Sequence, residues 1–327
     1  MNVLVVCSGN FHNGISPLVK EQVDSIIIKG VQVEIFSINK SGLSGYFSAI
    51  PRLRKKIKEI RPDLIHVHYG LSGLVTFLTF TKCRIIISFM GDDLIGSVGK
   101  GNKYTFLSKI LVIINKLLAR NYYDYSITKS KELNEILSKV KHKEILPNGV
   151  NFNVFYNQPF DLCREKLNIS QEELIVLFAA NPLRAEKNYL LANEAISLIG
   201  KKQLKLFTVF SEEQNMLNYC YNAADVLLLT SLHEGSPNVV KEAMACGCPI
   251  VSTRVGDVAE VMANTDGCYI ADFNPESISR YVVKAIEFRR LHKKTNGRDR
   301  LIQLKLDSVS VAEKLIVIYK KTINNKE

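Results

Sequence analysis

The residues whose types and spacing are best suited to chemistry are two acidic side chains in the second half of the chain. Glu234 and Glu242 are separated by seven residues. Leu227 to Thr230, just before them, has the pattern of a short buried strand, and Gly235-Ser236-Pro237-Asn238 cannot continue it. Val239 to Cys246 then has helical spacing. The pattern predicts that the two carboxylates flank a strand-to-helix turn.

The start of this helix predicts an anion site. The first N–H groups of a helix have no partner within it, and together with the helix dipole they favour phosphate. We expect the backbone N–H groups of residues 237 to 240 to point out of the helix start. A carboxylate only accepts hydrogen bonds, so carboxylates on both sides favour a phosphate that carries hydroxyls on both sides. The ligand that fits is a nucleotide-sugar, and the alternative is an acidic loop before an ordinary helix.

These residues carry a family resemblance. Glu234, Glu242, the following Ala-Met-Ala-Cys-Gly-Cys-Pro-Ile-Val and Val255-Gly256-Asp257 resemble the donor site of retaining glycosyltransferase family 4. The resemblance implies that Glu234 faces the donor sugar and that Glu242 binds the ribose hydroxyls. It also implies that the loop and helix start bind the pyrophosphate; the residues concerned are Gly235, Ser236, Pro237, Asn238 and Val239.

The family's fold implies the architecture that positions this site. It is the α/β GT-B fold, two facing Rossmann-like domains with parallel sheets and a cleft between them. A length of 327 residues suits two domains. Leu146-Pro147-Asn148-Gly149-Val150 is a turn signal between them. We therefore expect an acceptor-side domain over 1–147, a nucleotide-sugar domain over 148–306, and a final helix over 307–327 that crosses back to the first domain.

The first domain should open as a βαβ unit. Val3 to Cys7 is an apolar run typical of a buried parallel strand, and a helix is expected from about Pro17 to Gly30. The turn from Ser8 to Gly14 lacks the G-x-G-x-x-G pattern of dinucleotide binding. The family has a glycine loop here that approaches the donor phosphate, and Gly14 matches it.

Two later strands of the first domain end in polar residues. Leu64 to His68 is a predicted strand, and the resemblance makes His68 a candidate sugar or acceptor contact; a packed core histidine is the alternative. Arg84 to Phe89 is another strand, which ends in a segment similar to the family's His-Gly-x-Asp. Asp93 takes the acidic place in it, and the resemblance makes Asp93 and Met90 candidate acceptor or sugar contacts as well. Met90 stands where many members have a histidine that contacts the donor sugar, and a thioether cannot donate a hydrogen bond.

Two cations follow the first predicted strand of the second domain. Arg184 and Lys187 come after Leu174 to Ala180, and in the family an arginine and a lysine neutralise the pyrophosphate at this place. An alternative for Arg184 is a salt bridge with Glu186. By resemblance we expect Glu234, Lys187 and Arg184 to serve catalysis.

The excess positive charge lies in the first half of the chain. The net charge is +11. Residues 1–150 hold 21 Lys and Arg against 11 Asp and Glu, whereas residues 151–327 hold 22 against 21. A helix opening at Arg52 carries cations around a narrow apolar stripe, and it could lie on an anionic membrane or be an ordinary surface helix. Nucleic acid is not expected, because no DNA- or RNA-binding motif is present.

Cysteine usage and hydropathy indicate the cellular compartment of the protein. Seven scattered cysteines without metal-ligand spacing indicate a reducing compartment. No signal peptide is recognisable, and the apolar run from Ile110 to Ala119 contains Lys116 and is too short for a membrane span. We expect a cytoplasmic protein that could lie peripherally on the inner face of the membrane.

The resemblance implies a metal-independent, retaining transfer of a sugar from a nucleotide diphosphate to an acceptor hydroxyl. The acceptor is expected to be a carbohydrate or lipid-linked, in bacterial surface polysaccharide synthesis. No cofactor is expected beyond the donor itself. Two alternatives stay open: a GT-B nucleotide-sugar epimerase, and a non-catalytic nucleotide-sugar-binding subunit of another transferase.

Overall fold

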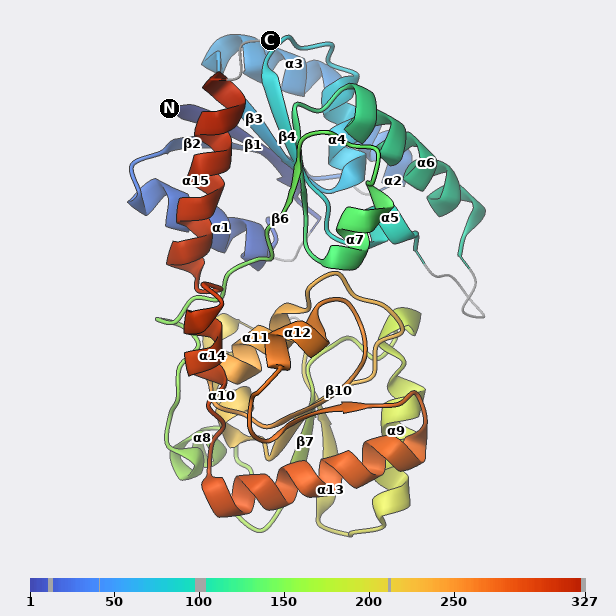
Figure 1. Cartoon of the computed structure of the whole chain (residues 1–327), viewed down its shortest axis with the longest axis vertical. Helices are drawn as coiled ribbons and strands as arrows, with labels where there is room; N and C mark the ends of the chain where they lie inside the picture. The colour runs from blue at the N-terminus through green and yellow to red at the C-terminus, as the bar shows by residue number, and fades with distance from the viewer. Residues whose placement is uncertain (11–13, 41, 98–103, 211–212, 325–327) are drawn as a thin grey trace. The chain divides into compact units, whose positions relative to one another are not determined.

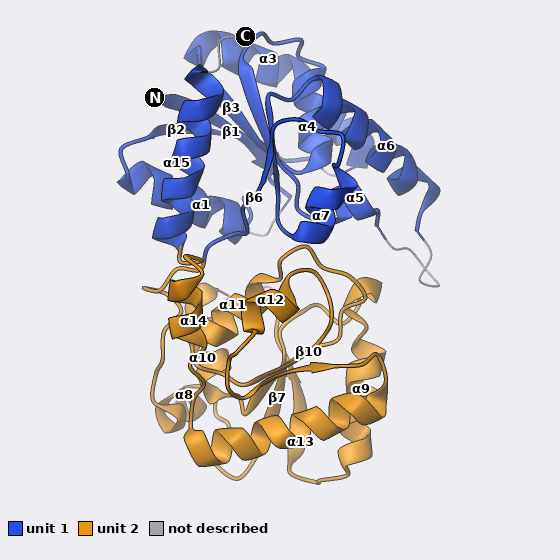
Figure 2. Ribbon diagram, in the orientation of Figure 1, with its two compact units in different colours: residues 1–149, 308–327 blue, residues 150–307 orange. Residues whose placement is uncertain are grey.

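The chain forms two compact units that divide near residue 150. The computed structural model describes residues 1–327 except 11–13, 41, 98–103, 211–212 and 325–327. Unit 1 comprises residues 1–149 and 308–327, and unit 2 comprises residues 150–307 (Figure 2). The boundary expected from the turn at Pro147 lies within two residues of this division.

Unit 1 is built on a six-stranded parallel sheet. The order of its strands is β2-β1-β3-β4-β5-β6, and all the pairings are parallel. The central strands are buried and mostly apolar on both faces, because helices cover both sides of the sheet. The strands are β1 (Asn2–Ser8), β2 (Gln32–Ile38), β3 (Leu64–His68), β4 (Arg84–Ser88), β5 (Tyr125–Thr128) and β6 (Lys143–Ile145).

The helices of unit 1 include the end of the chain. Helix α15 lies beside α1 against the same core (Figure 1), and Lys29 at the end of α1 pairs with Glu313 of α15 at 2.6 Å. The helices are α1 (Pro17–Ile28), α2 (Gly42–Phe47), α3 (Ile50–Ile60), α4 (Gly70–Phe77), α5 (Asp92–Ile95), α6 (Phe106–Asn121), α7 (Lys131–Ile136) and α15 (Ser308–Asn324).

Unit 2 repeats the plan with five parallel strands in the order β11-β10-β9-β7-β8. They are β7 (Leu174–Phe178), β8 (Leu204–Thr208), β9 (Val226–Leu229), β10 (Ile250–Thr253) and β11 (Cys268–Ala271). The helices are α8 (Phe160–Lys166), the 3₁₀ turn η2 (Ala185–Lys187), α9 (Tyr189–Ile199), α10 (Gln214–Ala223), α11 (Asn238–Ala245), α12 (Val258–Met262), α13 (Pro275–His292) and α14 (Gly297–Gln303). The two Rossmann-like parallel-sheet domains that the sequence predicted are confirmed.

Two local features depart from the sequence pattern. The short β6 follows β5 at the sheet edge, although two charged residues out of three leave no strand signal there. The basic run 289–294 at the end of α13 is exposed except at its first residue. Arg289 is buried, and its guanidinium donates to the carbonyl of Asn222 at 2.7 Å. A long aliphatic stem lets such a charge reach buried carbonyls at the end of a helix.

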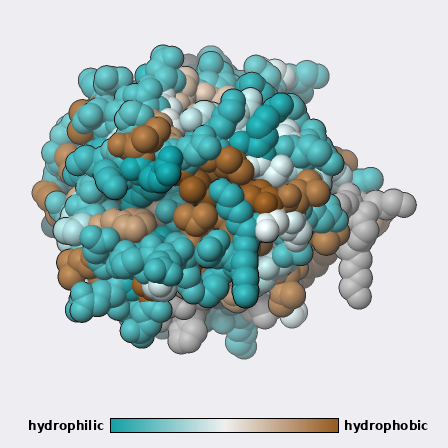
Figure 3. All heavy atoms as spheres, turned by 90° about the horizontal axis from the view of Figure 1, so that it is seen from below, coloured by the Kyte–Doolittle hydropathy of each residue, from teal (hydrophilic) through white to brown (hydrophobic). Residues whose placement is uncertain are grey.

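The face shown in Figure 3 is mostly polar, with a patch of apolar side chains surrounded by polar ones. Among the described residues, no helix combines the length and the apolar character needed to cross a bilayer.

Candidate active site

The loop between β9 and α11 carries the predicted acidic pair. β9 is fully buried and ends at Leu229, and α11 begins at Asn238 with Pro237 as its N-cap. Proline pre-sets the backbone for a first helical turn but has no N–H. The expectation that residue 237 contributes an amide was therefore wrong. The donors at this helix start begin with Asn238 and Val239.

Glu234 lies against Lys187 of η2. The Lys187 ammonium is 2.5 Å from the Glu234 carboxylate, and both side chains are largely but not fully buried. The Ser231 hydroxyl donates to the same carboxylate oxygen at 2.8 Å. The fold thus brings together two predicted residues that are 47 positions apart in the chain.

Hydrogen bonds to the backbone hold the loop that carries Glu234 against the η2 turn that carries Lys187. The Thr230 hydroxyl donates to the Lys187 carbonyl at 3.0 Å, and the Leu232 N–H donates to the Glu186 carbonyl at 2.8 Å. The second bond joins the residue before Lys187 to the loop that carries Glu234. The Lys187–Glu234 contact is therefore supported by the backbone of both loops.

Arg184 precedes this contact and pairs with Glu186. The salt bridge with Glu186 was the alternative that the sequence left open for Arg184. About half of the Arg184 side chain is exposed, whereas Glu186 is largely buried.

Glu242 is buried in α11 and accepts a hydrogen bond from the Tyr221 hydroxyl at 2.7 Å. Burial raises the pKa of the Glu242 carboxyl, while the Tyr221 bond and the nearby Lys241 ammonium act in the opposite direction. Burial also raises the pKa of Tyr221 well above its usual value, so Tyr221 stays a donor. Glu242, the residue predicted to bind the ribose hydroxyls, is thus oriented by a tyrosine from α10.

Lys241, next to Glu242, is a buried ammonium that donates to the Ser236 hydroxyl at 3.0 Å. Burial lowers its pKa to about 8, against the opposing charges of Asp257 and Glu242. Asp257 also interacts with the Ser236 side chain. Ser236 of the predicted donor loop is therefore held between a buried cation and a carboxylate.

Gly256 allows two loops of unit 2 to pack closely. Its φ is +52°, and a Cβ atom there would lie 2.4 Å from the carbonyl oxygen of Gly235 and 2.9 Å from that of Glu234. Any larger residue would push the loop after β10 away from the acidic loop. This close approach accounts for glycine in the Val-Gly-Asp segment.

The candidates of unit 1 have different surroundings. Gly14 has a φ of +87° and open space where a side chain would be, so the backbone conformation alone favours glycine there. Part of the turn from Ser8 to Gly14, residues 11–13, lies outside the described residues.

His68 is a buried core residue in β3. Its ring centroid lies 4.3 Å from that of His66, and burial lowers the pKa of His68 to about 3. Neither ring nitrogen of His68 has a hydrogen-bond partner among the described residues. His66 contacts the Tyr319 hydroxyl at 2.6 Å and the Ser88 hydroxyl at 2.9 Å. Because side chains alternate along a strand, the rings of His66 and His68 lie on the same face of the sheet.

Asp93 is a buried carboxylate that accepts backbone hydrogen bonds. The N–H groups of Met90, Gly91 and Gly70 donate to it at 3.0 Å each. Burial raises its pKa to about 6, although these bonds act in the opposite direction. Asp93 therefore fixes the loop after β4, in which Met90 takes part through its backbone.

Comparisons with known proteins match both units to glycosyltransferase families. Residues 194–287 match the model for glycosyl transferases group 1, and residues 14–125 match the model for glycosyl transferase 4-like domains. The chain is a glycosyltransferase of the family 4 type.

Solved structures share the fold, and sequence relatives include other glycosyltransferases. A sucrose-phosphate synthase from Thermosynechococcus elongatus has a TM-score of 0.83 at 16% identity, with 100% of both chains covered. HepE from Anabaena, solved with UDP-glucose, has a TM-score of 0.75 at 13% identity, and the match covers 98% of this chain and 100% of HepE. A putative teichuronic acid biosynthesis glycosyltransferase from Bacillus subtilis is 24% identical over 72% of this chain and 64% of its own.

Sequence reasoning missed two side chains in this glycosyltransferase. Tyr221 and Lys241 are both fully buried next to Glu242. A lysine directly before Glu242 in a mostly apolar helical stretch was the available signal for Lys241. Tyr221 had none, because a tyrosine in an amphipathic helix normally belongs to the core. Among the described residues, no three carboxylate, imidazole or thiol side chains gather closely enough to hold a metal ion.

Proposed function

We propose that this glycosyltransferase moves a sugar from a nucleoside diphosphate to an acceptor hydroxyl with retention of configuration. The observation that carries the proposal is the contact between Lys187 of η2 and Glu234 in the loop that leads to α11. A carboxylate that accepts sugar hydroxyls, a cation for phosphate and free helix-start donors are what such a donor requires.

Each group has a proposed role at the donor. Glu234 faces the sugar near its reacting carbon, and Glu242 accepts from the ribose hydroxyls. The N–H groups of Asn238 and Val239 bind the pyrophosphate. Lys187 and Arg184 stabilise the charge that grows on the diphosphate as it leaves, and stabilisation that strengthens in the transition state raises turnover.

The remaining predicted residues have supporting roles in the proposal. Gly235, Ser236 and Pro237 shape the phosphate loop. Gly14, by resemblance to the family, contributes a backbone contact to the donor phosphate.

The proposed transfer needs no nucleophile from the protein. The bond between the sugar carbon and the leaving phosphate oxygen breaks, and the acceptor oxygen forms its bond on the same face. The leaving phosphate accepts the acceptor's proton. We propose that transfer needs no metal ion, because the lysine, the arginine and the helix start supply the positive potential.

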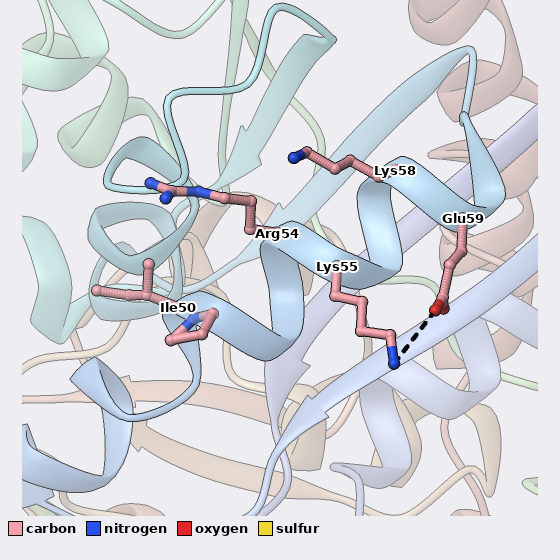
Figure 4. A pocket seen from close by; sticks show the side chains of 6 residues that line it. Ile50, Arg54, Lys55, Lys58 and Glu59 are labelled. Atoms are coloured by element: carbon pink, nitrogen blue, oxygen red, sulfur yellow. Dashed lines mark ion pairs between the residues drawn. The ribbon is translucent and has the colours of Figure 1, made fainter.

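The acceptor is proposed to be lipid-linked, in surface polysaccharide synthesis. The basic character of α3 supports this part of the proposal, as does the similarity to the teichuronic acid glycosyltransferase. An open pocket of about 510 Å³ lies along α3, lined by Ile50, Pro51, Arg54, Lys55, Lys58 and Glu59. Arg54 and Lys58 extend to the same side of the helix, while Lys55 turns to Glu59 at 3.8 Å (Figure 4). We propose that anionic lipid headgroups at the inner membrane face contact these cations.

Binding of nucleotide-sugars tests the donor site. A thermal-shift panel that begins with UDP and UDP-glucose should raise the unfolding temperature of the wild type, since a ligand stabilises the state that binds it. Glu242→Ala should lose most of this shift, and Glu234→Ala should keep it and lose turnover. Unchanged affinity and turnover in both variants would refute the site.

Product analysis tests the reaction. Transfer should persist in EDTA, and a loss that manganese restores would overturn metal independence. The anomeric configuration of the product should match that of the donor. Release of free nucleotide together with an epimerised free sugar, without an acceptor product, would identify an epimerase instead. No turnover by the purified chain with any donor would favour a binding subunit.

A further inference from the structure

Helix α6 carries apolar side chains on its outer side. Its four-residue apolar stripe consists of Phe106, Ile110, Ile113 and Leu117, which are 80%, 38%, 59% and 54% exposed. They recur at intervals of three and four residues, so they form one continuous row along the helix. A row of exposed apolar side chains of this length is an interaction surface rather than scattered surface residues.

The opposite side of α6 shows that this orientation is fixed. Asn115 is buried and donates to the Asp93 carbonyl at 2.8 Å. Ser108 is also buried and donates to the Thr105 carbonyl at 2.8 Å. Leu118 and Ala119 are buried on the same inner side as these polar residues, while the four large apolar side chains of the stripe stay outside. The helix cannot bury its apolar stripe by rotating without breaking the bond between Asn115 and Asp93.

The charges of α6 indicate what the stripe contacts. The helix contains Lys109, Lys116 and Arg120 and no acidic residue. At 3.6 residues per turn the three cations fall together along one border of the stripe. An apolar row bordered by cations is typical of a helix that lies in the surface of an anionic bilayer. A second copy of the chain meeting this stripe through the same face would bring two such cationic borders together.

The basic helix α3 is linked to α6 through the end of α4. Arg54 of α3 donates to the Leu78 carbonyl at 3.2 Å, and its guanidinium lies over the ring of Phe80, which is also exposed. Phe80 contacts Phe77, and the Phe77 ring meets that of Tyr122, directly after α6, at 4.7 Å. An aromatic row therefore connects the two cationic helices within unit 1.

We propose that α6 is a membrane-docking helix, whose apolar stripe inserts among the headgroups of an anionic bilayer while its cations contact the lipid phosphates. This inference rests on the lipid-linked acceptor of the proposed function and deepens it, because it holds unit 1 at the surface where such an acceptor would be. The sequence pattern alone did not indicate this role, since the segment is too short and too charged to span a membrane.

Vesicle sedimentation tests the docking helix without any need for turnover. The full chain should bind mixed vesicles that contain both phosphatidylcholine and the anionic phosphatidylglycerol. It should bind vesicles of phosphatidylcholine alone far more weakly. Ile113→Ser with Leu117→Ser should weaken binding to the anionic vesicles at least tenfold, because each aliphatic side chain contributes several-fold. Neutralising Lys109, Lys116 and Arg120 to Gln should weaken it by about fivefold per cation.

Matched controls separate docking from folding and from the donor site. Leu198→Ser with Leu291→Ser changes two similarly exposed side chains of unit 2 and should bind vesicles as the wild type does. UDP stabilisation reports on the donor site separately, so its loss would leave the docking result standing. Wild-type binding by the stripe variant would overturn the proposal. The proposal would also be overturned if the wild type formed a dimer in sedimentation velocity and did not bind vesicles, while the stripe variant was a monomer.

Discussion

In each of the two parallel sheets, one strand leads into a loop that carries a carboxylate. The two carboxylates have different partners. Asp93 after β4 accepts from three backbone N–H groups. Glu234 after β9 accepts from the Lys187 ammonium and the Ser231 hydroxyl. A backbone donor cannot leave without rebuilding its loop, whereas a side chain can rotate toward a ligand. The comparison separates a carboxylate that holds the fold from one that can exchange its partner.

The largest expected effect comes from the exchangeable pair. Lys187→Ala should lower kcat by about 10²- to 10³-fold, the size found when one donor to a developing charge is removed. Its effect on the donor KM should be much smaller. Steady-state kinetics with the donor identified by thermal shift measures both constants.

Two variants sharpen this result. Lys187→Arg keeps the charge and should recover part of kcat. Arg184→Ala removes a half-exposed cation that pairs with Glu186. It should lower kcat by no more than about tenfold, since exposed pairs contribute little. A rise in KM with an unchanged kcat for Lys187→Ala would show that the lysine only binds the donor.

The backbone-bound carboxylate should affect stability instead. Asp93→Asn has fewer acceptor sites for the three N–H groups and should lower the free energy of unfolding by about 1–3 kcal/mol. Denaturant unfolding measures it. Donor affinity in unit 2 should stay unchanged.

The pH dependence of stability provides a second measurement on Asp93. Its pKa is raised from 3.8 to about 6 in the folded protein, so the folded state holds this proton more tightly than the unfolded state. The free energy of unfolding should therefore fall as pH rises from about 4 to 6. Asp93→Asn should lack this contribution. Identical slopes for the wild type and the variant would show that Asp93 titrates normally.

The parts of this molecule that depend on local patterns could be predicted from the sequence. Buried parallel strands such as β1 could be predicted from their apolar runs, and the spacing of Glu234 and Glu242 marked the turn before α11. The edge strand β6 escaped because it has only three residues, two of them charged.

Partners from distant parts of the chain could not be predicted. Tyr221 reaches Glu242 from α10, and Arg289 reaches the Asn222 carbonyl from α13. Such contacts depend on how helices pack over a sheet, which single-residue patterns do not encode. The outward side of α6 was equally hidden, because periodicity reveals a stripe but not which side faces the core.

The smallest expected effect concerns Lys241, a charge that is buried like Asp93 but bound to a side chain like Glu234. Lys241→Met should raise the donor KM by about tenfold or less with kcat nearly unchanged, because the Ser236 hydroxyl loses a charged partner. Lys320→Met, on the exposed side of α15, is the matched control and should change neither constant.

The titration of Lys241 distinguishes a positioning role from a purely structural one. Its pKa is lowered from 10.5 to about 8, so between these values the unfolded state binds this proton and the folded state does not. The free energy of unfolding should therefore fall as pH falls from about 10.5 to 8. As pH rises through about 8, the donor KM of the wild type should rise, since the neutral amine holds Ser236 more weakly. Lys241→Met should show neither trend. A wild-type KM that stays flat across pH 8 while the stability changes would mean that Lys241 supports the fold alone.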